Sequence, residues 1–119
     1  MLWATLSPAS LSREAATIIA HEANVILVSA ASAWEIATKV RLGKLPGAES
    51  LEKDFLDVME DAGYTLLPID VESALRAGRL ISEHRDPFDR MIAAQSLAED
   101  IPVLSTDSKL DLLGVRRIW

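Results

Sequence analysis

The stretch HRDPFDRMIAAQSLAEDIPVLSTDSKL, residues 84–110, contains a helix start, an apolar helix and a short apolar run in succession. Asp86 suits the N-cap of this helix, Pro87 its first position and Asp89 its first turn, where an acid complements the helix dipole. The predicted helix ends near Glu99, and the run IPVLS after it is typical of a buried strand. Helices that lead into buried strands are the units of α/β domains.

The rest of the chain shows the same alternation of helix and strand patterns. Helices are predicted over residues 11–23, 32–43, 51–63 and 70–84, and further strands over residues 24–30, 64–69 and 115–119. This alternation predicts an α/β domain with a mainly parallel sheet and helices on both faces. In such a sheet the helix starts and the carboxyl ends of the strands share one edge, which is where ligands bind.

Composition restricts the classes of protein that fit. A chain of 119 residues, half of them apolar, fits a single domain over residues 1–119, and the absence of cysteine excludes disulfides and thiolate metal sites. A net charge of −6 argues against a broad basic surface for nucleic acid, but not against chemistry through a bound divalent cation. No apolar stretch approaches the ~20 residues of a membrane span, and no signal-peptide start is evident. We therefore expect a cytoplasmic protein.

Three acidic residues are predicted to meet at the ligand-binding edge of the sheet. Glu35 lies at the start of the helix predicted over 32–43, Asp89 in the first turn of its helix, and Asp107 just past the strand IPVLS. Each has a purely structural alternative: Ser32 and Glu35 fit a capping box, and the two aspartates suit a helix start and a turn. Together, however, like charges at one edge repel, and a divalent cation with oxygen ligands offsets that repulsion. A Mg²⁺ or Mn²⁺ site and the structural alternatives both remain open.

Three segments resemble the PIN domain, in particular its VapC-type toxin branch. They are VSAASAWEIATKVRLGKL (28–45), HRDPFDRMIAAQSLAEDIPVLSTDSKL (84–110) and LGVRRIW (113–119). The resemblance implies a three-layer αβα domain with a mainly parallel central sheet and a ribonuclease activity that depends on Mg²⁺ or Mn²⁺. It implies that Glu35, Asp89 and Asp107 are catalytic and metal-binding acids. Ser105 matches the small hydroxyl residue that supports the last of them.

The resemblance also implies partners and a departure from the family pattern. The implied partners are an RNA substrate, a second copy in a homodimer, and the small antitoxin protein of a type II toxin–antitoxin pair, which blocks the site, commonly through a basic side chain. PIN domains begin with a central strand that ends in an Asp, and MLW at residues 1–3 resembles only the tail of that segment. We therefore expect an N-terminally shortened domain without the first strand and first acid, and weak or no cleavage. The alternative function is a non-catalytic PIN-like remnant that binds the antitoxin or dimerises.

Other side chains near this edge have two interpretations each. The basic residues could bind RNA phosphates, although solvated charges and ion pairs are the more common roles. These residues are Lys39, Arg41, Arg85, Arg90 and Lys109. His84 could carry a proton or contact a phosphate, although a lone histidine before a helix is more often on the surface. Trp3 and Trp34 are predicted to be core or interface anchors rather than platforms for base stacking.

Overall fold

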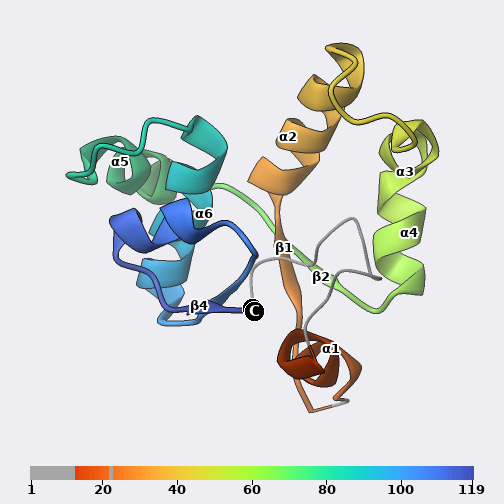
Figure 1. Ribbon diagram of the computed structural model, residues 1–119, viewed down its shortest axis with the longest axis horizontal. Helices are drawn as coiled ribbons and strands as arrows, with labels where there is room; N and C mark the ends of the chain where they lie inside the picture. The colour runs from red at the N-terminus through yellow and green to blue at the C-terminus, as the bar shows by residue number, and fades with distance from the viewer. Residues whose placement is uncertain (1–12, 22) are drawn as a thin grey trace.

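The computed structural model describes residues 13–21 and 23–119 (Figure 1). The elements in chain order are α1 Arg13–Ala20, β1 Leu27–Ser29, α2 Ala30–Arg41, α3 Glu49–Lys53, α4 Phe55–Asp61, β2 Thr65–Leu67, α5 Val71–Arg79, α6 Pro87–Glu99, β3 Val103–Leu104, the 3-10 helix η2 Ser108–Leu113, and β4 Arg117–Ile118. Within the described residues, no helix is long and apolar enough to cross a membrane. The segment at residues 1–3 lies outside the described residues, so the absence of a first strand stays a prediction.

The strands in the described part of the chain form two separate parallel pairs. β1 pairs with β2, with Leu27 opposite Thr65, and β3 pairs with β4, with Val103 opposite Arg117. This confirms a mixed α/β fold with parallel strands. The strands were predicted to form one sheet. In the described residues they form two pairs, and no described strand is hydrogen-bonded to both β1 and β3.

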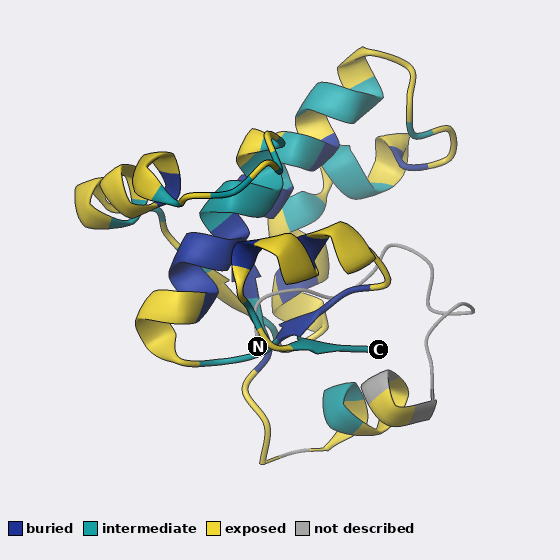
Figure 2. Cartoon of the chain, turned by 60° about the vertical axis from the view of Figure 1, so that its left-hand side comes forward, coloured by how far each residue is buried: buried dark blue, intermediate teal, exposed yellow. Residues whose placement is uncertain are grey.

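Helix α6 is at the centre of the packing. It contacts α2, α5, β3 and η2, and its residues 92–96 are buried (Figure 2). In Figure 1, α5 and α6 are seen to the left of β1 and β2, and α3 and α4 to the right. Removal of apolar side chains from water is the main driving force for this packing. The central cluster consists of Ala31, Ile92, Ala93, Val103, Leu110 and Leu113.

A buried polar network joins α6 to the β1–β2 pair. The side chain of Gln95, on α6, donates from Nε2 to the carbonyl oxygen of Pro68 at 3.1 Å, just after β2. Its Oε1 accepts a hydrogen bond from the Oγ of Ser29, at the end of β1. The same Oγ accepts from the backbone N–H of Ala31 at 3.0 Å and so caps α2. Because buried polar groups are costly without partners, this network fixes α6 relative to both strands.

The start of α2 differs from the prediction. The helix begins at Ala30 with Ser29 as its N-cap, so Ser32 and Glu35 do not form the capping box that was the structural alternative for them. The reason is that the Ser29 hydroxyl, at the end of β1, already accepts from one of the free N–H groups of the first turn, that of Ala31. Ser32 lies inside α2, and its Oγ is buried without a hydrogen-bond partner among the described residues.

Two further helix boundaries differ as well. The helix predicted over 51–63 is instead α3 and α4, which meet at Asp54, where φ of −105° and ψ of 24° interrupt the helical conformation. The helix predicted over 70–84 ends at Arg79, and residues 80–86 form an irregular loop. By contrast, the start of α6 is as predicted, because Asp86 accepts a hydrogen bond from the backbone N–H of Asp89 at 2.9 Å and Pro87 is the first helical residue.

Candidate active site

The three predicted acids lie on three different elements. Asp89 is in the first turn of α6, and Asp107 is the N-cap of η2, shortly after β3. Glu35 is in the second turn of α2 rather than the first, because that helix begins earlier than predicted. Helix starts that follow strand ends are the expected place for a ligand site in an α/β fold.

An aromatic contact joins the two helices that carry Glu35 and Asp89. Trp34 and Phe88, the residues just before them, pack edge to face with ring centroids 4.6 Å apart and planes at 74°. Trp34 is nevertheless 55% exposed, so it anchors the helix starts at the surface rather than in the core. Burial raises the pKa of Asp89 above its ordinary value, and the negative charges of Asp86 and Glu35 raise it further. The two predicted acids therefore interact electrostatically.

Lys39 neutralises part of this acidic site. Its Nζ lies 2.6 Å from Oε2 of Glu35, one helical turn earlier on α2. The hydrogen bond with Glu35 raises the pKa of Lys39, and the charges of Glu35, Asp86 and Asp89 act in the same direction against the effect of burial. Asp86, which was interpreted only as a helix cap, therefore belongs to the same electrostatic group. The signals available in the sequence were the i,i+4 spacing of Glu35 and Lys39 and the repeated acid in DPFD.

Asp107 and Ser105 form a separate structural unit. The Asp107 carboxylate accepts from the backbone N–H of Lys109 at 3.0 Å, and the Asp107 backbone N–H donates to the Ser105 Oγ at 3.1 Å. Asp107 is not among the charges that shift the pKa of Asp89. Asp107 acts instead on Arg117, whose pKa is raised first by its hydrogen bond to Asp111 and further by the charge of Asp107. No three His, Cys, Asp or Glu side chains in the described ranges group closely enough to hold a metal ion, and the three-acid site stays a prediction.

Two residues of the HRDPFDR segment are committed to contacts within the protein. Arg90, one of the candidate phosphate contacts, uses its guanidinium to donate to the backbone carbonyls of Ala77, Leu80 and His84. The side chain of His84 is only 11% exposed, and its Nε2 lies 2.7 Å from Oδ2 of Asp89. Of its two interpretations, the surface role therefore does not describe the side chain of His84.

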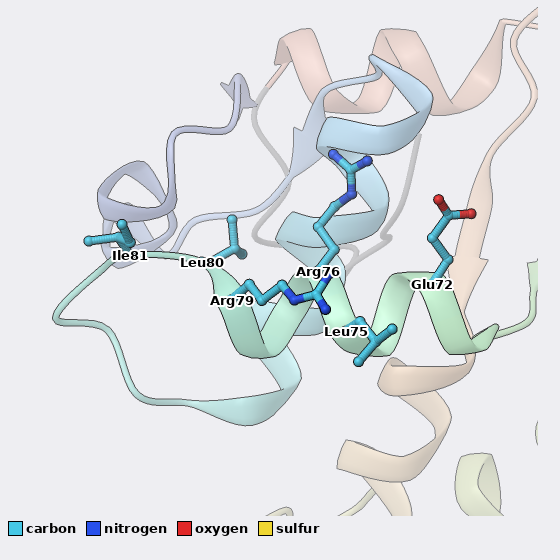
Figure 3. A pocket seen from close by; sticks show the side chains of 6 residues that line it. All are labelled: Glu72, Leu75, Arg76, Arg79, Leu80 and Ile81. Carbon is cyan, nitrogen blue, oxygen red and sulfur yellow. The ribbon is translucent and has the colours of Figure 1, made fainter.

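A pocket lies on α5, with a lining that includes none of the predicted acids. Its lining residues are Glu72, Leu75, Arg76, Arg79, Leu80 and Ile81. Figure 3 shows the side chains of Arg76 and Arg79 extending from α5, with Ile81 to their left and Glu72 to their right in the view. Glu35 and Asp89 therefore lie outside this pocket.

Comparison with known proteins identifies the class to which this fold and these acids belong. The PIN domain family matches residues 1–115, so the chain belongs to the PIN domain family. It is similar to Ribonuclease VapC16 of Mycobacterium tuberculosis (strain ATCC 25618 / H37Rv), with 46% identity over 57 residues. The aligned stretch covers 48% of this chain and 40% of that relative, so the chain spans less than half the length of the curated relative it matches.

Proposed function

We propose that the chain is a VapC-type endoribonuclease, the toxin of a type II toxin–antitoxin pair. The observation that carries this proposal is the electrostatic coupling of Glu35, on α2, and Asp89, in the first turn of α6, in a PIN domain. The name of the relative, a ribonuclease, supports RNA as the substrate. Family membership also supports the three-layer αβα architecture, with both strand pairs in one central sheet.

The donor set at this site suits Mg²⁺ or Mn²⁺. Carboxylate oxygens are hard ligands, and Mg²⁺ is usually held by one or two carboxylates together with waters and substrate phosphates. Glu35 and Asp89 supply such a pair, and we propose Asp107, with Ser105 supporting its backbone, as a third ligand. When bound, a divalent cation activates water and neutralises charge at the phosphate that is cleaved.

Asp89, Lys39 and Arg90 would have different roles at this site. Asp89 is half-buried, which limits the competition of bulk water for its oxygens. Lys39 would release Glu35 as a cation binds, because both compete for the same carboxylate. The guanidinium of Arg90 donates to four backbone carbonyls, so it would act by fixing the loop before α6 and not by contacting RNA.

We further propose a small antitoxin partner, a homodimer and a cytoplasmic location. The position of Lys39 supports the antitoxin, since an ammonium group is already stable beside Glu35, Asp86 and Asp89. A basic side chain from a partner could therefore block the site in the same way. A non-catalytic antitoxin-binding or dimerisation module is the second candidate, and the observation that favours it is the neutralisation of Glu35 by Lys39 within the chain.

Cleavage of RNA with and without divalent metal separates the two functions. The chain should cleave RNA with Mg²⁺ or Mn²⁺ and lose the activity in a chelator. Glu35→Gln and Asp89→Asn should each reduce cleavage by about 10- to 100-fold or more, whereas Glu60→Gln, a change at an exposed acid on α4, should not. Asp107→Asn tests the third ligand in the same assay. Absence of metal-dependent cleavage by the unchanged chain would favour the binding module.

A further inference from the structure

The loop between α5 and α6 places a histidine against the half-buried acid of the site. The Nε2 of His84 lies 2.7 Å from the Oδ2 of Asp89, and the two side chains are 11% and 17% exposed. An ionised carboxylate can only accept hydrogen bonds, so the Nε2–H of His84 is the donor in this contact. This contact does not follow from helix capping, because Asp86 already caps α6 through the backbone N–H of Asp89.

The backbone of His84 is held on both sides of its side chain. Its N–H donates to the Oγ of Ser82 at 3.1 Å, and its carbonyl oxygen accepts from Nη1 of Arg90 at 3.0 Å. Arg90 follows Asp89 directly on α6 and also holds the carbonyl of Ala77 at the end of α5. The imidazole and the carboxylate are therefore fixed by the same helix, which leaves little freedom in their relative position.

The two oxygens of Asp89 differ in their contacts with the described residues. Oδ2 is engaged by His84, whereas Oδ1 accepts no hydrogen bond from any of the described residues. A carboxylate that is held at one oxygen presents the other in a defined direction. Partners behind a metal ligand act in this way, and their loss typically weakens metal affinity about 10- to 100-fold.

We propose that His84 is a positioning residue for Asp89. The imidazole of His84 holds Oδ2 of Asp89, so that Oδ1 is left to bind a divalent cation together with Glu35. This inference rests on the proposed metal site and adds a residue to it. The competing role is purely structural, in which His84 only fastens the loop 80–86 to α6. The two roles make different demands on a side chain that replaces His84. Positioning needs a hydrogen-bond donor at the place of Nε2, whereas the structural role only needs the loop to stay attached to α6.

The test is Mn²⁺ titration of the 119-residue chain by calorimetry, with thermal unfolding of each variant. His84→Gln places an amide N–H near the former Nε2, whereas His84→Asn carries the same amide on a chain one methylene shorter. We expect His84→Ala and His84→Asn to weaken Mn²⁺ binding about 10-fold or more, and His84→Gln to stay near the unchanged chain. His21→Gln, at the other histidine of the sequence, is the matched control, because His21 is exposed and its Nδ1 accepts from the backbone N–H of Ala23, far from Asp89 in the sequence.

Equal losses of affinity in the Gln, Asn and Ala variants would overturn the positioning role, as would unchanged affinity in all three. A loss of affinity that merely follows the loss of thermal stability across the variants would also overturn it. If the unchanged chain binds no Mn²⁺, the proposed metal site fails and the inference fails with it. Binding by the unchanged chain with no dependence on position 84 overturns the inference alone.

Discussion

Replacing Arg90 should destabilise the protein because its guanidinium acts as a clamp on the loop before α6. Nε donates to the carbonyl of Ala77 at 3.1 Å and Nη1 to that of His84 at 3.0 Å, while Nη2 donates to the carbonyl of Leu80. All three bonds are part-buried. At about 1 kcal/mol for each bond, Arg90→Met should lower the free energy of unfolding by about 3 kcal/mol. That is a large share of the ~5–15 kcal/mol stability of a typical domain.

Urea unfolding, followed by circular dichroism, measures this loss. Arg79→Met is the matched control, since Arg79 is exposed on α5 and makes no hydrogen bond or ion pair with the described residues, so the change should stay within about 0.5 kcal/mol. Arg90→Lys keeps the charge but not the planar fork, and should lose most of the same stability. If Arg90→Lys is as stable as the unchanged chain, or Arg90→Met no less stable than the control, the clamp is refuted.

The remaining predictions concern the metal site, the buried network and pH. Lys39→Met should tighten Mn²⁺ binding about two- to fivefold, because an ion pair of ~0.3–1 kcal/mol no longer competes for Glu35. Calorimetry measures this affinity, with Lys44→Met as the control. Unchanged or weaker binding by the Lys39→Met variant would contradict the competition. Gln95→Leu leaves the Ser29 hydroxyl and the Pro68 carbonyl without their partner. The free energy of unfolding, measured in urea, should fall by about 2–4 kcal/mol. A loss below about 1 kcal/mol would contradict this prediction. The pKa of Asp89 is raised in the fold, so its ionised form costs stability at neutral pH, and that cost disappears as pH falls below the unfolded pKa. Asp89→Asn should therefore stabilise the metal-free chain at pH 7 but not near pH 3, and equal effects at both pH values in thermal unfolding would argue against a raised pKa.

The sequence by itself determined the features that depend on neighbours along the chain. The start of α6 follows from Asp86 and Pro87, which satisfy and preset the first turn without help from other elements. Apolar runs marked β1 and β3 as buried strands, and their alternation with helices gave the α/β class. The PIN resemblance was also readable, since its motifs are contiguous stretches. Asp107 was correctly located just after β3, although its carboxylate forms the cap of η2.

The tertiary structure decided the features that depend on segments far apart in the chain. Ser29, and not Ser32, is the N-cap of α2. Its hydroxyl also donates to the side chain of Gln95, which follows 66 residues later in the chain. Burial of His84 required α5 to end at Arg79 and the following loop to fold back onto Asp89, which no local pattern encodes. A hydrogen-bonding side chain can be recognised from its type alone. Its partner is selected only when burial removes water as the alternative, and burial is a property of the assembled fold.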